Sequence, residues 1–398
     1  MKWNRSLPSG TKDKLFKEAI LSHQLEERVN HHFSARGYQR IETPLIEFEE
    51  VFDSMEQKNS SRYRFFDEQG RILVLRPDMT LPIGRVISTT GIILPVKLNY
   101  SGKIFRVNKG NSGEYNEQLQ AGMELIGFDS LKAEMECLTN AIVISQKSGL
   151  RDFQLELGHA AIFQTIIQEL DLDKKEEATF KWLLQSKNAL RIQSFLKDYQ
   201  DHELFPLISR LPRLFGKVNV LEEMSTLTEN TTILAAVNEM KQLVIHIQRM
   251  FPNQEILVDI GAVQEFKYYT GITFKAYTFQ SSDSFLSGGR YDNLLSVFSE
   301  NSVPAVGLVF YLDRMMNSLE RNNQLEKTKS IQTLIHFDET SFLEADRLLE
   351  MEPSSSLSLY ANLEDTFAYA KLWEIPRIII INQEGRKDIQ LEVGEIND

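Results

Sequence analysis

Hydrophobic residues recur at helical spacing near the start of the chain. Every fourth position is apolar at Leu21, Leu25, Val29 and Phe33, and Gly37 follows as a stop signal. This pattern predicts an amphipathic helix over residues 13–35 that packs by its apolar face.

Shorter segments with the alternation of β-strands follow this helix. Apolar and polar residues alternate around 41–46, and further strand signals lie at 71–75 and 98–106. Glycine-containing spacers separate these segments, which favours an antiparallel sheet. Strand signals return at 256–260 and 268–279, and a helix is expected after Val309. We expect these later segments to complete the same sheet.

The middle of the chain has helical periodicity instead. Residues 163–250 are rich in Leu, Lys and Glu, with interruptions at Pro206 and Pro212. This stretch predicts a helical insertion, with bounds at 166–250. The core of the protein is then expected to comprise residues 1–165 and 251–322.

The polar stretch 321–330 is predicted to link this core to a small α/β domain over 330–398. Strand patterns in that domain alternate with helical ones. The strands are expected at 333–337, 357–360 and 377–381, and the helices at 341–350 and 363–373. This β-α-β-α-β order is typical of a parallel or mixed sheet. The fold class of the whole chain is therefore predicted to be α+β.

Composition narrows the classes of partner. The formal net charge is −12, and residues 331–398 hold 14 acidic and 5 basic residues, a net charge of 5 − 14 = −9. This sign disfavours a nucleic acid partner. The single cysteine, Cys137, leaves no intramolecular disulfide and is expected to be a core thiol. Without a signal-peptide pattern or a membrane-length apolar run, we expect a cytoplasmic protein that does not contact a membrane.

Short motifs occur in a fixed order along residues 5–320. They are Leu7–Thr11, Gly37-Tyr38 with Ile41–Pro44, Leu75–Thr80, Phe105-Arg106, Gly122–Gly127, Tyr268–Gly271, Gly288–Asp292 and Leu312–Arg314. Each motif alone is weak, but the ordered series resembles a class II aminoacyl-tRNA synthetase, specifically histidyl-tRNA synthetase. The resemblance implies an antiparallel sheet flanked by helices, with a shortened anticodon-binding domain at the end.

This resemblance also implies a set of histidine-binding residues. The ammonium group would be held at Asp78, Thr80 and Gln120, and the carboxylate by the guanidinium of Arg106. Both imidazole nitrogens would be met by Glu124 together with a tyrosine hydroxyl from Tyr268 or Tyr269. Every part of a free histidine thus has a candidate partner.

The residues that the synthetase family uses for ATP are altered. In the synthetase family, these positions supply cations for the phosphates, a contact for adenine, and a glycine that leaves space beside adenine. The corresponding residues here are Asn108, Glu114, Asn116, Gln264 and Tyr311. The family's arginine at Arg314 is kept. Loss of one such donor typically lowers a rate by about 10²- to 10³-fold. The combined changes imply that adenylate formation is lost, and we expect no catalytic residue, cofactor or metal.

Other interpretations of these residues remain open. Asp78 and Glu124 could be buried partners of an arginine such as Arg76, and Tyr268 and Tyr269 could mark two faces of a strand. The pair His31-His32 is not expected to bind a metal, because adjacent helical residues point apart.

A histidyl-tRNA synthetase-like core without an ATP site or RNA-binding charge resembles the ATP phosphoribosyltransferase regulatory subunit family. That resemblance implies a non-catalytic subunit in histidine biosynthesis, with histidine as effector. Its expected partner is the short-form catalytic subunit of ATP phosphoribosyltransferase, in a hetero-oligomer that contains a homodimer of this chain. An active histidyl-tRNA synthetase with an atypical ATP site, and a synthetase-like module that binds RNA or protein, are the alternatives.

Overall fold

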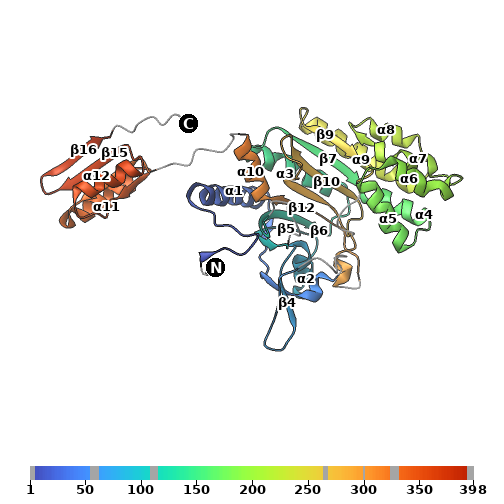
Figure 1. Cartoon of the computed structure of the whole chain (residues 1–398), viewed down its shortest axis with the longest axis horizontal. Coiled ribbons are helices and arrows are strands. Elements are labelled where there is room, and N and C mark those ends of the chain that lie inside the picture. Colours follow the sequence, from blue (N-terminus) through green and yellow to red (C-terminus); the bar gives the residue numbers. More distant parts are fainter. Residues whose placement is uncertain are drawn as a thin grey trace. The chain divides into compact units, whose positions relative to one another are not determined.

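A computed structural model describes residues 5–53, 62–107, 115–262, 268–298, 301–322 and 331–391. The chain divides into two compact units, Met1–Leu325 and Glu326–Asp398 (Figure 1). The predicted core and helical insertion both lie within the first unit. Their separation into two domains remains a prediction, and most of the predicted linker, 323–330, lies outside the described residues.

A large sheet forms the centre of the first unit. In the described chain it has nine strands in the order β1-β5-β6-β12-β11-β10-β7-β9-β8. Their bounds are β1 Gln39–Arg40, β5 Val96–Phe105, β6 Glu117–Ile126, β7 Phe153–His159, β8 Phe215–Gly216, β9 Glu255–Asp259, β10 Ile272–Thr278, β11 Leu286–Arg290 and β12 Ala305–Tyr311. The run from β5 through β7 is antiparallel throughout, which confirms the predicted sheet.

Helices and loops cover both faces of this sheet. The helices α1 (Phe16–Ser34), α3 (Lys132–Lys147) and α10 (Leu312–Arg321) contribute to one core together with Met123 and Leu125 of β6. The opposite face packs against α2 (Thr80–Thr90). Because neighbouring strand residues point to opposite faces, Glu124 lies on the α2 side.

The predicted first helix forms because its apolar stripe is buried. Leu25, Val29 and Phe33 are all buried in α1, and the chain reverses just after it at Gly37, where φ is +79°. Glycine adopts this left-handed conformation without a steric penalty.

The helical segment is continuous with the sheet and lies beside β7 and β9 (Figure 1). It comprises α4 Ala160–Glu169, α5 Lys174–Gln185, α6 Ala189–Phe195, α7 Phe205–Arg210, α8 Val220–Ser225 and α9 Thr231–Met250. It begins earlier than 163 because the His159 ring accepts a hydrogen bond from the amide of Ala161 and caps α4. Asn230 caps α9 in the same way, through the amides of Thr232 and Ile233.

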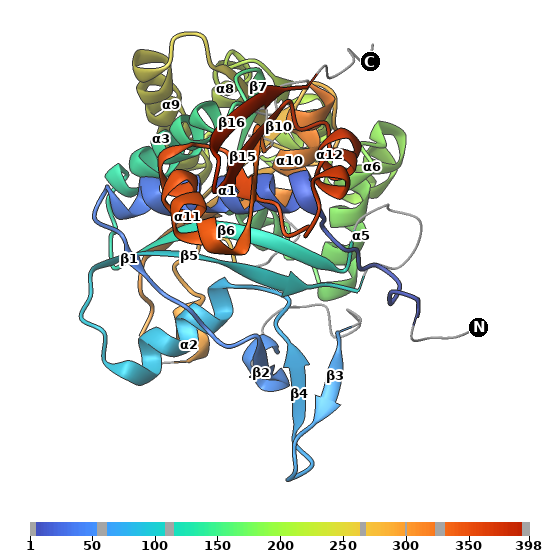
Figure 2. The same cartoon turned by 90° about the vertical axis from the view of Figure 1, so that its left-hand side faces the viewer.

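A small antiparallel sheet of β2 (Ile46–Phe48), β4 (Ile72–Leu75) and β3 (Arg64–Phe66) also belongs to the first unit. Figure 2 shows β3 and β4 running side by side near α2. The predicted strand around 41–46 is largely wrong, because residues 41–45 connect β1 to β2 without regular structure.

The second unit has a four-stranded sheet in the order β14-β13-β15-β16. Its strands are β13 Thr333–Phe337, β14 Ser355–Leu357, β15 Arg377–Asn382 and β16 Gly385–Gln390, and its helices are α11 Phe342–Met351 and α12 Leu363–Leu372. The helices pack in two separate clusters on the sheet. The β-α-β-α-β order is confirmed, but the second strand ends at Leu357 instead of spanning 357–360. The sequence analysis missed β16, whose residues are mostly polar and exposed.

Two further expectations concern the described chain as a whole. Cys137 is buried in α3 with a free thiol, as predicted. Within the described ranges, no helix has the length and apolar character needed to cross a lipid bilayer.

Candidate functional site

A cavity of about 400 Å³, including its open mouth, lies on the α2 side of the sheet. Strands β5, β6, β11 and β12 contribute side chains to it, as do α2 and the segment before β10. All seven residues singled out from the sequence line this one cavity: Asp78, Thr80, Arg106, Gln120, Glu124, Tyr268 and Tyr269. The fold therefore brings together residues that are far apart in the chain.

Glu124 is the most deeply buried charged group of the cavity, with 1% of its surface exposed. Thr80 Oγ1 donates to Glu124 Oε1 at 2.9 Å, and the Tyr291 hydroxyl donates to Oε2. Burial raises the pKa of Glu124 to about 8, and the nearby Asp78 carboxylate acts in the same direction. Gly307 faces Glu124 on β12, where a Cβ atom would lie 1.7 Å from Oε2. Only glycine leaves room for this carboxyl group.

Asp78 lies at the start of α2. Its Oδ1 accepts a hydrogen bond from the Leu81 amide at 3.0 Å, in the first turn of the helix. Burial raises the pKa of Asp78, whereas the positive charge of Arg106 lowers it. The alternative partner, Arg76, donates to the carbonyl oxygens of Thr43 and Lys103 instead. Arg76 is therefore not the partner of Asp78 or Glu124, whereas the charge of Arg106 does act on Asp78.

Three tyrosine rings form one wall of the cavity. The ring centroids of Tyr268 and Tyr269 are 4.7 Å apart, and those of Tyr268 and Tyr291 are 5.8 Å apart. Tyr268 and Tyr269 precede β10 and both line the cavity, so they do not mark two faces of a strand. Burial raises the pKa of both phenols, which keeps them as neutral hydrogen-bond donors and acceptors.

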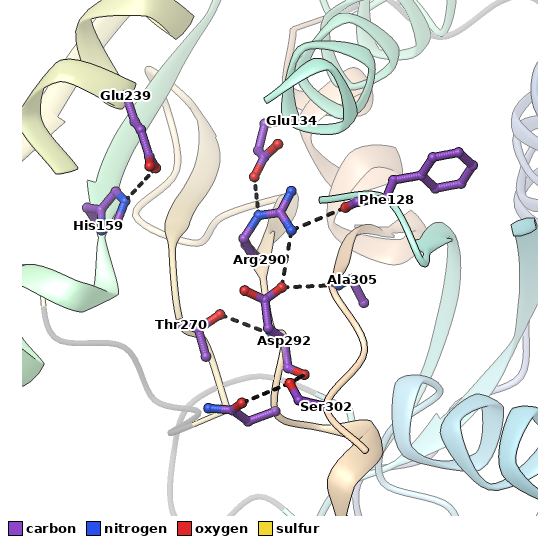
Figure 3. A network of polar contacts seen from close by, with 10 residues as sticks. Phe128, Glu134, His159, Glu239, Thr270, Arg290, Asp292, Ser302 and Ala305 are labelled. Carbon is purple, nitrogen blue, oxygen red and sulfur yellow. Dashed lines mark hydrogen bonds and ion pairs between the residues drawn. The ribbon is translucent and has the colours of Figure 1, made fainter. Parts of the chain in front are cut away.

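The two neighbours of Tyr291, Arg290 and Asp292, are held by the bonds that Figure 3 shows. Arg290 forms an ion pair with Glu134 of α3 and hydrogen-bonds to Asp292 at 3.1 Å. The Asp292 carboxylate also accepts from the Ala305 amide at 3.2 Å. Since these neighbours on either side are held outside the cavity, the intervening Tyr291 side chain points into it.

Thr270 fixes the tyrosine segment to the same strand. The Thr270 amide donates to the Arg290 carbonyl at 2.8 Å, and the Asp292 amide donates to Thr270 Oγ1 at 3.0 Å. These two bonds keep Tyr269 beside Tyr291. The motif Gly288–Asp292 thus acts through its backbone and its charged residues to shape the cavity.

Sequence reasoning did not name several lining residues as site residues. These are Tyr100, Ser287, Gly288, Tyr291, Gly307, Leu308, Val309 and Tyr311. Gly288 and Tyr291 lie in one of the ordered motifs, and the resemblance relates Tyr311 to a position of the synthetase's ATP site. The alternation of charged and aromatic residues in the motif Gly288–Asp292 is the signal that could have identified Tyr291.

Two of the five residues that differ from the synthetase's ATP site lie within the described residues, Asn116 and Tyr311. Asn108, Glu114 and Gln264 lie outside the described residues. Asn116 is buried, and its amide group donates to the Tyr63 hydroxyl at 2.9 Å and to the Ser9 carbonyl at 3.2 Å. Tyr311 lines the cavity, and the guanidinium of Arg314 lies 4.4 Å from its ring centroid. The retained arginine therefore stacks on the tyrosine that replaces a glycine.

The donors and acceptors of the cavity suit a small zwitterion. The lining includes the carboxyl groups of Asp78 and Glu124 and the positively charged guanidinium of Arg106. In the part of the chain that the structure describes, no three His, Cys, Asp or Glu side chains are placed to hold a metal ion.

Comparison with known proteins identifies the family. Residues 10–315 match the family described as Histidyl-tRNA synthetase. A Listeria monocytogenes serotype 4b (strain F2365) protein described as ATP phosphoribosyltransferase regulatory subunit is 45% identical over 98% of this chain and 98% of its own length. A Bacillus thuringiensis (strain Al Hakam) protein with the same description is 36% identical over 96% of this chain and 93% of its own length. This chain belongs to the ATP phosphoribosyltransferase regulatory subunit family.

Solved structures share the fold of this regulatory-subunit family member. A Bacillus halodurans structure described as ATP phosphoribosyltransferase regulatory subunit/histidyl-tRNA synthetase has a TM-score of 0.81 and 24% identity, over 95% of this chain and 98% of that one. Histidyl-tRNA synthetase from Nostoc sp. PCC 7120 has a TM-score of 0.76 and 19% identity, over 97% of each chain. The predicted class II synthetase-like fold is confirmed.

Proposed function

We propose that this chain is a non-catalytic regulatory subunit of ATP phosphoribosyltransferase and that it binds histidine in the cavity described above. The observation that carries the proposal is the convergence of all seven candidate side chains on one cavity. The description of its relatives as regulatory subunits supplies the biological role. The site needs no cofactor for this role.

Each group of a free histidine has a partner of suitable chemistry in the cavity. Glu124 accepts from one imidazole nitrogen, and a hydroxyl of Tyr268 or Tyr269 meets the other. Asp78 and Thr80 lie where they can accept from the ammonium group, and Arg106 can bind the carboxylate through two parallel N–H groups. A ligand of this kind replaces the solvent that otherwise hydrates these buried groups.

The proposed assembly joins this chain to the short-form catalytic subunit in the cytoplasm, as a homodimer within a hetero-oligomer. That assembly performs the first step of histidine biosynthesis and is inhibited by histidine. Inhibition requires that histidine bind two conformations of the assembly with different affinity. The direct test is co-purification of both chains, followed by an assay of phosphoribosyl transfer with and without this chain. Activity that is the same in its absence would contradict the proposal.

Substitutions in the cavity test whether it is the histidine sensor. Glu124→Gln and Tyr269→Phe should weaken histidine binding in calorimetry of the complex and raise the histidine concentration that inhibits phosphoribosyl transfer. Tyr199→Phe, in the helical segment, is a matched control outside the cavity lining. If Glu124→Gln and Tyr269→Phe changed neither binding nor inhibition, the sensor would lie elsewhere, and a subunit interface would be the next candidate.

An active histidyl-tRNA synthetase is the alternative that the fold permits. Histidine-dependent exchange of pyrophosphate into ATP by the purified chain would establish it and exclude a purely regulatory role. The stacking of Tyr311 on Arg314 favours the regulatory interpretation, because this ring occupies space where the synthetase keeps a glycine. For an RNA-binding module, the acidic second unit is unfavourable, and a gel-shift with tRNA at physiological salt is the test.

A further inference from the structure

Tyr311 connects two other residues of the cavity by hydrogen bonds. Its hydroxyl lies 3.0 Å from Ser287 Oγ and is hydrogen-bonded to the Arg106 guanidinium. Arg106 is held a second time, because its Nε donates to the Pro77 carbonyl at 2.8 Å. With the ring of Tyr311 against the Arg314 guanidinium, the hydroxyl has little freedom to move. Arg106 is thereby oriented before any ligand arrives.

Gln120 presents a second donor from the neighbouring strand. It is the register partner of Tyr311 across β6 and β12, lines the cavity and is only 3% exposed. Its Nε2 is buried and has no hydrogen-bond partner among the described residues. A buried donor without an acceptor typically costs about 1–3 kcal/mol. A ligand that places an acceptor here would remove this cost.

We infer that Arg106, Gln120 and Tyr311 form a subsite for the carboxylate of the ligand, with Tyr311 as the residue that positions the guanidinium. The inference rests on the proposed function and deepens it. An amide NH₂ group and a guanidinium both donate hydrogen bonds, and a carboxylate accepts them. An ammonium group has only donors, so it gains nothing from Gln120 Nε2. Gln120 therefore moves from the ammonium set expected from the sequence to the carboxylate set.

This subsite makes the cavity selective for a free α-carboxylate. L-histidinol carries the same imidazole and ammonium groups as L-histidine but has a hydroxymethyl group in place of the carboxylate. The wild-type chain should therefore bind L-histidine much more tightly than L-histidinol. The preference should depend on Tyr311 and Gln120, although neither residue contacts the imidazole.

The experiment measures the affinity of both ligands by calorimetry on the full-length chain and two nearly isosteric variants. Tyr311→Phe keeps the ring but removes the hydroxyl. It should weaken the binding of L-histidine roughly tenfold and leave the affinity for L-histidinol unchanged. Gln120→Glu replaces the donor with a carboxylate. It should weaken the binding of L-histidine by more than about tenfold without weakening the binding of L-histidinol. Tyr199→Phe and Gln193→Glu, both in the helical segment, are the matched controls.

The outcomes separate this inference from the function on which it rests. Selective loss of L-histidine affinity in both variants supports the carboxylate subsite. Equal weakening of both ligands in Tyr311→Phe would assign the hydroxyl a purely structural role and overturn the inference. Tighter L-histidine binding in Gln120→Glu would return Gln120 to the ammonium set, with the same consequence. If the wild-type chain and the complex bind no L-histidine, the proposed sensor fails and the subsite fails with it.

Discussion

Two sides of the cavity differ in how their side chains are engaged. On the side of Glu124, both carboxyl oxygens already accept hydrogen bonds, from Thr80 and from Tyr291, and the carboxyl group still lines the cavity. On the side of Asn116, polar groups bind one another and the N-terminal segment. The first side is organised around a space, and the second is closed by its own residues.

This difference is clearest at Asn116, one of the residues that depart from the synthetase pattern. Asn116 joins residues from three parts of the chain, because its side chain contacts Ser9 and Tyr63 and its backbone carbonyl accepts from the Arg106 amide. We expect the two sides to respond differently to substitution, with binding lost on one and stability lost on the other.

The largest effect is expected at Gly307. Gly307→Ala would place a methyl group on the Glu124 carboxyl and also 2.8 Å from the Met123 carbonyl. Displacement of Glu124 should weaken histidine binding by about 100-fold or more and destabilise the fold by about 1–3 kcal/mol. Calorimetry and chemical unfolding measure the two quantities. Gly84→Ala in α2 is the control, because the added methyl group would meet the side chains of Phe298 at 3.1 Å and Leu295 at 3.3 Å, neither of which lines the cavity.

A pH dependence of stability should distinguish Glu124 from groups on the closed side. Its folded-state pKa of about 8 lies above the ordinary value of 4.5, so the folded chain retains a proton that the unfolded chain releases. This contribution is fully present below about pH 4.5 and is lost as the pH rises through about 8. In the ligand-free chain, Glu124→Gln should remove that loss, so its advantage over the wild type grows from pH 5 to pH 8.5. The free energy of unfolding is measured in urea at each pH. If its pH dependence were the same in the wild type and in Glu124→Gln, the raised pKa would not belong to Glu124.

Asp78 allows charge and helix capping to be separated. Asp78→Asn keeps an oxygen that can accept from the Leu81 amide, so the free energy of unfolding should stay near that of the wild type. Without the negative charge, histidine affinity should fall roughly tenfold. Asp78→Ala should lose the same affinity and about 1 kcal/mol of stability as well. An Asp78→Asn variant with wild-type affinity would remove Asp78 from the ammonium set.

On the closed side, the smallest effect on binding is expected at Asn116. Asn116→Ala removes the hydrogen bonds to Ser9 and Tyr63 and should lower the free energy of unfolding by about 1–2 kcal/mol. Histidine affinity should not change, because the side chain does not line the cavity. Weaker binding in this variant would show that the two sides are coupled, and the comparison above would have to be revised.

Elements with one dominant pattern could be predicted from the sequence. The helix α1 follows a stripe of apolar residues, and the glycine-containing spacers between strand segments indicate an antiparallel sheet. Ordered motifs then placed seven residues in one site, although they come from distant segments. The edge strand β16 had no such signal, since its side chains face solvent and its position depends on pairing with β15.

Strand register is what the sequence could not provide. The contact of Glu124 with Tyr291 and its dependence on Gly307 require that β6, β12 and β11 align residue by residue. Likewise, the orientation of the Gln120 amide depends on which donors and acceptors surround it after folding. Residue type and spacing identify a candidate site, but the partners within it come from three-dimensional packing.

The pairing of β6 with β12 also sets when the cavity can form during synthesis. β5 and β6 leave the ribosome early, whereas β12 follows only after the helices α4–α9 and strands β9–β11 have been made. Until then, the Glu124 strand has an open edge, and closing this long-range contact slows folding. A nascent chain that stops before residue 305 contains most of the ligand-facing residues but lacks the strand that brings them together. The cavity thus forms only when nearly the whole first unit has emerged.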